Sequence, residues 1–546
     1  MNFLIFLTFF TFSELANLVT LAIDQLNETG IVVTNVTADN AQSNITMFHL
    51  LGANLNDPEN LKVTLNLLNV QGKPIVVIQD VSHIVKLVRN AFGEMKIFYM
   101  PDGSKVLWDH VAALHRLQTD KGLHLANKVS IEHIFFHKKK MKVYLATQLL
   151  SNSVADAIEF CNKDLKLSEF SDSEATCQFL RVFNRIFDIL DSTQPFCLKK
   201  PALKVSNKDI WTKDFDDTVE YIRSLYMMDP TKEPETKRKK PISQRVIDGQ
   251  RRRGFLGFIV DIMSFKFIFS TYIEETLQLD FLLGHKFSQD HLERTNGAVR
   301  SSLGSNNNPT VRQFKAAMKK ILLGATHHGV AENCQVQDDT AITTPTFTAD
   351  SNKLFSELFD LDDDKSAVEI YLQSLECNIE KSDFEYRDAI LNYISGFIQK
   401  KLIKKERCVD CALYLENIPA SNLKEGGLIK VKNRGGLVLP SVEIEKVVNI
   451  ADALYSEINT DKLFGQKNIV KKIQIETCKV VAETHPHLLE ILDEHMGTLG
   501  SHKFLMIKNI VGCYISMRGR RSAKMLNENS PKIRMQMTKL ILFKNQ

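Results

Sequence analysis

Four acidic residues have the types and spacing that metal-assisted chemistry needs. Asp39 and Asp80 each follow a short β-branched segment, and Asp290 and Glu293 stand three positions apart in a segment with helical periodicity. Residues three apart share one face of a helix, so the last two carboxylates lie side by side. Carboxylates that converge in this way suit two divalent metal ions about 4 Å apart, which together promote phosphoryl displacement. Each residue taken alone also fits an ordinary turn, cap or surface position.

A second group of residues has the spacing of a zinc site. Cys408-x-x-Cys411 is half of such a site, and His495 and His502 are the histidines that could complete it. The nine cysteines are odd in number and scattered, which favours reduced thiols over a disulfide framework. A pair of structural cysteines without metal is the alternative interpretation.

Two basic runs, at 237–240 and 251–253, are typical of nuclear import signals or phosphate contacts. A solvated loop explains them equally well. The sequence contains no Walker-type glycine-rich loop that would cradle a nucleotide phosphate.

The elements that must position these residues alternate between helices and strands. Residues 14–30 have helical periodicity, 31–37 and 74–79 form short buried strands, and a helix follows at 83–90. This alternation predicts an α/β sheet whose carboxyl edge, where ligands collect, carries Asp39 and Asp80. Further helices are expected at 143–160, 175–191, 254–283, 287–300 and 310–323, the last capped by Thr310, followed by an acidic linker at 332–364 and a mostly helical region.

The composition indicates a folded protein. Its 546 residues are 44% hydrophobic and 25% charged, which excludes a collagen, a disulfide scaffold and a wholly disordered chain. The net charge of +4 is too small to identify a partner. No segment reaches about 18 uncharged apolar residues, so no membrane partner is expected.

The first sixty residues are unusual because no Lys or Arg precedes Lys62. An apolar start and sequons at Asn27, Asn35 and Asn44 are compatible with a secreted glycoprotein. A signal peptide, however, begins with a basic region, and none is present here.

The segment 287–293, Phe-Ser-Gln-Asp-His-Leu-Glu, resembles a motif of the P element and THAP-type DNA transposases. Other family-like segments follow the same order along about residues 15 to 546: Asp-x-x-His at 80–83 within 80–90, then 145–153, 254–258, 297–301, 306–314, Cys408-x-x-Cys411, 434–437, 440–441 and 539–544.

The resemblance implies an α/β RNase H-like catalytic domain, incomplete at its N-terminus and interrupted by a mostly helical GTP-binding insertion, with a helical C-terminal region. The boundaries expected are 1–95, 96–250, 251–330, 331–365 and 366–546. By position, Asp39 matches the family's second catalytic Asp, Glu293 its catalytic Glu, and Asp290 the Asp before it, so these three are the expected catalytic residues. Asp39 and Glu293 would hold Mg²⁺, whereas Asp80 is expected to be structural.

The family also implies nucleotide contacts in the insertion. By position these fall on Lys128, Val143, Asn184, Phe187, Asp188 and Asp191, where Asp191 replaces an Asn. Chemically, Lys128 suits a phosphate, Phe187 base stacking, and Asp188 the N–H edge of guanine. GTP is therefore an expected ligand, and DNA (transposon ends and target) and further copies of the chain are expected partners in the nucleus.

The departures from the family concern catalysis. The family's first catalytic Asp lies on a strand upstream of the helix that begins near Glu14, so we interpret the chain as a truncated member or incomplete gene model with an incomplete triad. Thr295-Asn296 replace an aromatic pair, and 302–304 replace Arg-Gly-Gly. The parent activity would be Mg²⁺-dependent DNA cleavage and strand transfer. The alternative is a domesticated nuclear DNA-binding or interaction protein without enzymatic activity.

Overall fold

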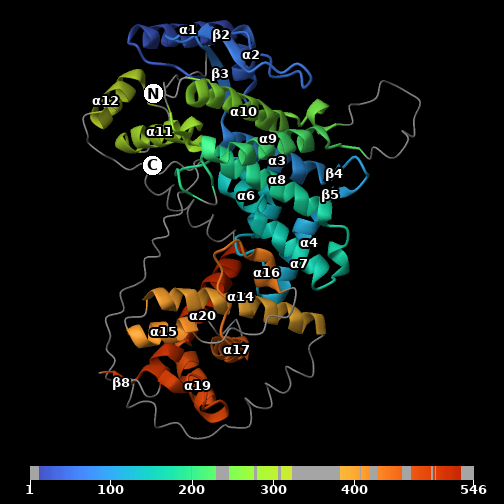
Figure 1. Ribbon diagram of the computed structural model, residues 1–546, viewed down its shortest axis with the longest axis vertical. Helices are drawn as coiled ribbons and strands as arrows, with labels where there is room; N and C mark the ends of the chain where they lie inside the picture. The colour runs from blue at the N-terminus through green and yellow to red at the C-terminus, as the bar shows by residue number, and fades with distance from the viewer. Residues whose placement is uncertain are drawn as a thin grey trace, which may run out of the picture. The chain divides into compact units, whose positions relative to one another are not determined.

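The computed structural model describes residues 11–197, 200–228, 245–275, 279–304, 309–322, 381–405, 408–417, 427–457, 469–492, 496–497 and 500–529. The chain divides into two compact units, and most of their helices are labelled in Figure 1. The first comprises Met1–His115, Lys128–Glu159 and Glu169–Thr340, and the second comprises Arg116–Asn127, Phe160–Ser168 and Ala341–Gln546. The basic run at 237–240, the acidic linker, His495 and the segment 539–544 lie outside the described residues.

A three-stranded mixed sheet organises the first unit. Strand β3 (Pro74–Gln79) lies in the middle, parallel to β1 (Asn35–Ala38) and antiparallel to β2 (Thr64–Leu68). Helices α3 (Val81–Met95) and α10 (Arg253–Phe269) pack together, and α10 also packs on β3 (Figure 1). The predicted strand at 74–79 is confirmed, including its burial.

Strand β1 is shorter than the strand predicted at 31–37, and only its last residue is buried. The preceding helix α1 (Phe12–Glu28) ends in a turn in which the Gly30 and Ile31 N–H groups donate to the carbonyls of Asn27 and Leu26, at 3.0 and 3.1 Å. Because this turn uses Ile31, the strand begins four residues later. The prediction was therefore wrong about the start of the strand and its burial, whereas its end directly before Asp39 is confirmed.

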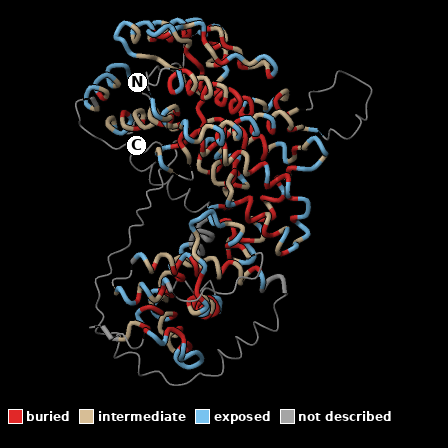
Figure 2. The backbone as a smooth tube through the Cα atoms, in the orientation of Figure 1, coloured by how far each residue is buried: buried red, intermediate tan, exposed pale blue. Residues whose placement is uncertain are grey.

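Aromatic side chains join helix α8 (Glu174–Leu190) to the sheet's helices. Phe179 of α8 lies 4.8 Å from Phe92 of α3, measured between ring centroids. Phe183, one turn later, lies 5.8 Å from Phe255 and 5.5 Å from Phe258, both on α10. All five rings are buried, and Figure 2 shows α10 buried along most of its length. Segments on either side of residues 96–250 thus share one core.

Helix α10 continues as a π-helical turn, Ser270–Glu275. Among the described residues, Arg253–Glu275 is the helix long and apolar enough to cross a membrane, and 78% of its most apolar window is buried within the protein. Its packing on β3 and α3 accounts for that burial. The helix predicted at 254–283 is confirmed as far as Glu275, whereas its predicted end was wrong, because Phe281–Leu282 forms a strand that pairs with Leu203–Lys204.

The helix predicted at 143–160 is two helices, α6 (Val143–Leu149) and α7 (Asn152–Lys163). The break follows from capping, because the Ser151 Oγ accepts a hydrogen bond from the Val154 N–H at 3.4 Å.

The first unit's other elements are α2 (Gln42–Leu50), β4 (Ile97–Tyr99), β5 (Lys105–Leu107), α5 (Ile131–Ile134), β6 (Leu203–Lys204), α9 (Lys208–Arg223), β7 (Phe281–Leu282), α11 (Asp290–Ser302) and α12 (Val311–Leu322). Helices α4 (Trp108–Lys121) and α7 contribute to both units.

The second unit is a helical bundle, as predicted for the described part of 366–546. It contains α14 (Lys381–Lys405), α15 (Val409–Asn417), α16 (Leu428–Lys432), α17 (Val442–Glu457), α19 (Ile469–Thr484), the hairpin β8 (Met496–Gly497) and β9 (Gly500–Ser501), and α20 (His502–Asn529). Buried Asp452 of α17 pairs with Arg387 of α14 at 2.7 Å and with Arg518 of α20 at 3.3 Å. This charge network ties three helices together.

Candidate functional site

Asp39 and Asp80 lie at the carboxyl ends of neighbouring parallel strands, as predicted. Ala38 stands opposite Gln79 in the register of β1 and β3, and the Asp80 N–H donates to the Ala38 carbonyl at 3.0 Å. The Asp39 Oδ1 accepts hydrogen bonds from the Ala41 N–H at 3.0 Å and from the Asn44 Nδ2 at 2.6 Å. These bonds hold a half-buried carboxylate at the sheet edge, in the turn that leads into α2.

Helix α11 begins at the same edge because the Asp80 carboxylate binds its start. The Asp80 Oδ1 accepts from the Gln289 N–H at 3.2 Å, and its Oδ2 accepts from the His83 N–H at 3.1 Å. One carboxylate therefore caps α3 and anchors the residue that precedes α11. Asp290 is buried, with the Ser82 Oγ 3.5 Å from its Oδ1. Glu293 follows one turn later and is half-buried.

Burial separates these carboxyl groups into two classes. Burial, with a smaller contribution from Asp290, raises the pKa of Asp80 to about 6. The pKa of Asp290 is raised by burial and then by Asp191, and that of Asp261 is raised well above its usual range by burial. Both oxygens of Asp80 already accept backbone N–H groups, and Asp261 accepts the Gln79 N–H, so these two carboxyl groups support the local backbone. The half-buried carboxylates of Asp39 and Glu293 are the better placed to hold a metal ion.

Sequence reasoning did not identify Asp261, Gly257 and Arg253 as parts of this edge. The Asp261 Oδ1 accepts from the Gln79 N–H at 2.7 Å, next to Asp80. Arg253 donates to the Asn40 carbonyl at 3.4 Å and to the Gln42 Oε1 at 2.5 Å. A lone acidic residue within an apolar run was the available signal for Asp261. Arg253 belongs to the basic run 251–253, whose Arg251 pairs with Glu94.

Four of the predicted nucleotide residues lie together at the C-terminal end of α8. The Asn184 Nδ2 donates to the Asp188 Oδ2 at 2.7 Å, and its Oδ1 accepts from the Asn152 N–H at 3.2 Å. Phe187 is 4% exposed, with the Lys200 ammonium 5.5 Å from its ring centroid. Asp191, immediately after α8, pairs with Lys200 at 2.5 Å. Lys200 therefore covers both the ring and the carboxylate.

The other two predicted contacts lie on separate segments. Lys128 is exposed ahead of α5, and Val143 is buried as the first residue of α6. Burial raises the pKa of Asp188 to about 6, opposed by Lys200 and by the hydrogen bond from Asn184. The roles of all six residues stay predictions.

The residues at the C-terminal end of α8 are joined to helix α11, which carries Glu293, through the residues that follow β7. The Gly284 N–H donates to the Ser192 Oγ at 2.9 Å, and the His285 N–H donates to the Ser192 carbonyl at 3.1 Å. The His285 Nδ1 also lies 3.4 Å from the Asp191 Oδ1. The end of α8 and the approach to α11 therefore form one connected structure.

The second unit brings together part of the predicted zinc site. The ligand atoms of Cys408, Cys411 and His502 all lie within 4.8 Å of one another. The Cys411 Sγ is 3.2 Å from the His502 Nδ1. His495 lies outside the described residues.

Four sequence families match consecutive parts of the chain. Residues 4–52 match the TNP-like RNase H N-terminal domain, and 82–203 match the TNP-like GTP-binding insertion domain. Residues 285–319 match the TNP-like RNase H C-terminal domain, and 382–524 match the C-terminal domain of DNA transposase THAP9. The expected fold, an RNase H-like domain split by a GTP-binding-type insertion and followed by a helical C-terminal domain, is confirmed.

Two curated proteins are similar over most of the chain. DNA transposase THAP9 of Homo sapiens is 25% identical over 535 residues, which cover 93% of this chain and 56% of the relative. The Transposable element P transposase of Drosophila melanogaster is 24% identical over 405 residues, covering 73% of this chain and 48% of the relative. The chain thus spans about half the length of the curated relatives it matches.

Among solved structures, the Drosophila P element transposase strand transfer complex aligns with a TM-score of 0.46 and 23% identity. The alignment covers 58% of this chain and 65% of that one.

Proposed function

The chain belongs to the family of DNA transposases that includes THAP9 and the P element transposase, and we propose that its RNase H-like part acts on DNA. The parent chemistry is metal-dependent phosphoryl transfer, through DNA cleavage and strand transfer. The observation that carries the proposal is the meeting of elements at one sheet edge. Asp39 and Asp80 end neighbouring parallel strands, and α11 starts on the Asp80 carboxylate.

The donor set at this edge fits a hard divalent cation. Two hydrogen bonds fix the Asp39 Oδ1, and among the described residues no hydrogen bond reaches its Oδ2. Carboxylate oxygens are the ligands that Mg²⁺ prefers. Asp39 and Glu293 would hold Mg²⁺, which would supply charge stabilisation at the phosphate and activation of the attacking oxygen. Asp80 and Asp290 act as positioning residues, because both are buried and Asp80 anchors two helix starts.

A basic face on α12 supports the choice of DNA as the substrate. Arg312, Lys315, Lys319 and Lys320 are exposed on this helix. The Thr310 Oγ1 accepts from the Gln313 N–H at 3.4 Å and caps its start, as predicted. Helix α12 packs against α11, so its charges lie beside the helix that carries Glu293. Lysine and arginine in such a position neutralise backbone phosphates without reading sequence.

The catalytic status of the polypeptide 1–546 is part of the proposal. Its residues supply two of the three metal-binding carboxylates that the family resemblance implies. We therefore expect it to bind DNA and metal without robust strand cleavage. Mg²⁺-dependent cleavage or strand transfer that Glu293→Gln abolishes would contradict this expectation. The alternative, a domesticated DNA-binding protein, shares the binding but requires neither Asp39 nor Glu293.

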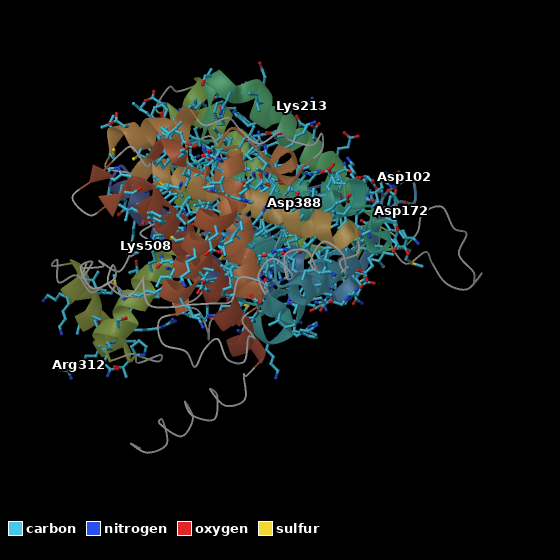
Figure 3. All side chains as sticks on the ribbon, turned by 90° about the horizontal axis from the view of Figure 1, so that it is seen from below. Asp102, Asp172, Lys213, Arg312, Asp388 and Lys508 are labelled. Atoms are coloured by element: carbon cyan, nitrogen blue, oxygen red, sulfur yellow. The ribbon has the colours of Figure 1, made fainter. Side chains whose placement is uncertain are left out.

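DNA binding is tested by the salt dependence of affinity for a duplex, measured by fluorescence anisotropy. Neutralising Arg312, Lys315 and Lys319 to glutamine should reduce the slope of log affinity against log salt by up to about 3, since each phosphate contact contributes about 0.9. The matched control is Lys213→Gln on α9, and Figure 3 shows Lys213 and Arg312 on separate parts of the surface. Equal slopes for the triple variant and the wild type would exclude α12 as the DNA contact.

Metal binding is tested without relying on activity. Fe²⁺ bound in place of Mg²⁺ generates hydroxyl radicals that cut the backbone near the metal. We expect cuts near residues 39 and 293, both lost in Asp39→Asn and both retained in the control Asp24→Asn, an exposed carboxylate on α1. Cutting at only one of the two positions would separate Asp39 from Glu293 and refute a shared site.

We also propose GTP as a ligand of the insertion and the nucleus as the compartment; self-association stays a prediction. In the structure all three sequon side chains donate hydrogen bonds: Asn27 to the Leu68 carbonyl, Asn35 to Thr37 and Asn44 to Asp39. A glycan on these amides would disturb the contacts, so the arrangement supports an unglycosylated protein. Nuclear fluorescence of the tagged chain is expected, and sensitivity to an endoglycosidase would contradict it.

A further inference from the structure

Three metal-binding side chains meet in the second unit, far from the carboxylates of the RNase H-like part in sequence. The ligand atoms of Cys408, Cys411 and His502 lie within 4.8 Å of one another, and Cys411 and His502 are 91 positions apart. A tetrahedral zinc ion with Zn–S near 2.3 Å and Zn–N near 2.0 Å separates its ligand atoms by roughly 3.5–3.8 Å. The observed cluster is therefore within a small side-chain adjustment of zinc geometry.

Helix α15 positions the two thiols on one side. The Cys408 carbonyl accepts the Ala412 N–H at 3.0 Å, so Cys408 lies at the boundary of the helix and Cys411 lies in its first turn. Residues three apart at a helix start face the same way. The N-terminal end of a helix also favours negative charge, as two zinc-bound thiolates require.

The hairpin formed by β8 and β9 positions the imidazole of His502. Met496 pairs with Ser501 across β8 and β9, and His502 is the next residue, where α20 begins. The Ser501 Oγ accepts the Lys503 N–H at 3.2 Å, and the Lys503 ammonium donates to the Pro486 carbonyl at 2.6 Å. Both bonds hold the first turn of α20, so the backbone that carries His502 is fixed on each side.

Buried apolar side chains flank the cluster on both helices. Cys411 is 1% exposed, whereas Cys408 and His502 are half-buried. Leu415 and Met506, one turn beyond Cys411 and His502 on their helices, are also buried. An uncompensated thiolate is unfavourable in such a place, but two thiolates and Zn²⁺ form a neutral group.

We propose that Cys408, Cys411 and His502 bind a zinc ion that joins the start of α15 to the start of α20. Soft thiolates with one imidazole select zinc over the hard cations expected at the carboxylate site. Binding releases the two thiol protons as the Zn–S bonds form, and no oxidant or reductant is needed. The role is structural, because the ion links two helices whose sequence positions are remote. The inference is independent of the proposed DNA chemistry.

The test uses the full chain, purified without chelator and analysed for bound metal. We expect about one zinc per chain in the wild type and in the control Cys513→Ser, a cysteine further along α20 that is not in the cluster. The double variant Cys408→Ser/Cys411→Ser should lose the zinc. Zinc retained by the double variant, or a wild type that neither carries nor takes up zinc, would overturn the proposal.

Cobalt substitution keeps the test decisive if the double variant fails to fold. Co²⁺ added to wild-type chain freed of metal should give a sulfur-to-cobalt charge-transfer band and intense tetrahedral d–d bands, both abolished by stoichiometric zinc. His502→Ala should weaken cobalt affinity at least tenfold while leaving the charge-transfer band, since both thiolates remain. A chain without the band, or a mass two hydrogens lower that marks a Cys408–Cys411 disulfide in the isolated protein, would refute the site.

Discussion

At the scale of single residues, burial distinguishes the carboxyl groups near the sheet edge from one another. Asp39 and Glu293 are half-buried, whereas Asp80, Asp261 and Asp290 are enclosed, and burial raises the pKa of each of these three above its ordinary value. Asp261 illustrates the difference, because its Oδ1 accepts the Gln79 N–H and its Oδ2 has no hydrogen-bond partner among the described residues. A protonated Asp261 is consistent with that arrangement. Burial therefore separates the proposed metal ligands, Asp39 and Glu293, from the enclosed carboxyl groups of the same part.

Asp188 is expected to make nucleotide binding depend on pH. Its pKa is raised to about 6 by burial, so lowering the pH below that value protonates the carboxyl group. Recognition of the guanine N–H edge needs the ionised form. We therefore expect GTP affinity to fall about tenfold per pH unit below about pH 6 and to level off above about pH 7. Isothermal titration with GTP from about pH 5 to about pH 7.5 measures this dependence.

Two variants distinguish titration of the Asp188 side chain from titration of the nucleotide itself. Asp188→Asn should bind GTP more weakly and show only the shallower pH dependence of the ligand. Asp209→Asn, an exposed carboxylate on α9, should behave like the wild type. If Asp188→Asn keeps the wild-type pH profile, Asp188 does not read the base.

At the scale of elements, sequence patterns predicted the strands and helices better than their ends. Strand β3 was predictable because Ile75, Val76, Val77 and Ile78 form a continuous buried β-branched run. The start of β1 was not predictable, because the Ile31 N–H donates a hydrogen bond to the Leu26 carbonyl at the end of α1. Ser151 carried a readable capping signal for the break between α6 and α7. Such local competition for hydrogen bonds is weakly encoded in hydrophobic periodicity.

Helix α10 passes close to the site edge at Gly257. A Cβ on Gly257 would lie 2.5 Å from the Ile84 Cγ2 and 2.7 Å from the Gln79 Oε1. Gly257→Ala gains about 0.5–1 kcal/mol of helix propensity but overpacks the contact by about 1–3 kcal/mol, so net destabilisation of about 1 kcal/mol, and at most about 2.5 kcal/mol, is expected. Gln79 immediately precedes Asp80, so iron-dependent cutting near residue 39 should also weaken.

Urea unfolding followed by circular dichroism measures the change. The control is Gly519→Ala on α20, where no atom beyond the helix's own backbone lies within 4 Å of the added Cβ, and a gain of about 0.5–1 kcal/mol is expected. A Gly257→Ala protein as stable as the wild type would show that α10 and α3 can separate at little cost.

At the scale of the whole molecule, both units are built from segments distant in sequence. The sheet's helix α10 returns after the insertion, and the second unit includes 116–127 and 160–168. Such pairings leave no local signal. The sequence accordingly indicated Cys408-x-x-Cys411, but it did not distinguish between His495 and His502 as the partner. The fold places His502 beside Cys411. The carboxylate edge was more predictable, because residues after parallel strands must meet at one side of a sheet.

The second unit combines residues 116–127 and 160–168 with residues 341–546, so we expect it to stay assembled when the chain is cut between these segments. The Tyr386 hydroxyl donates to the Leu123 carbonyl at 2.7 Å, Lys432 donates to the Leu125 carbonyl, and Arg518 donates to the Gly122 carbonyl. A specific protease site placed at residue 350 would leave 116–127 on one fragment and α14 to α20 on the other. Because both fragments contribute to one buried structure, they should co-elute in size-exclusion chromatography after complete cleavage.

The strength of that association depends on the same three contacts. Tyr386→Phe with Arg518→Ala removes two donors and leaves Asp452 with one of its two arginines, a loss of several kcal/mol for a buried charge. The cut double variant should therefore separate into fragments at a lower urea concentration than the cut wild type. Lys508→Ala, also on α20, should leave the dissociation midpoint unchanged. Spontaneous separation of the cut wild type in native buffer would mean that the second unit folds without the insertion segments.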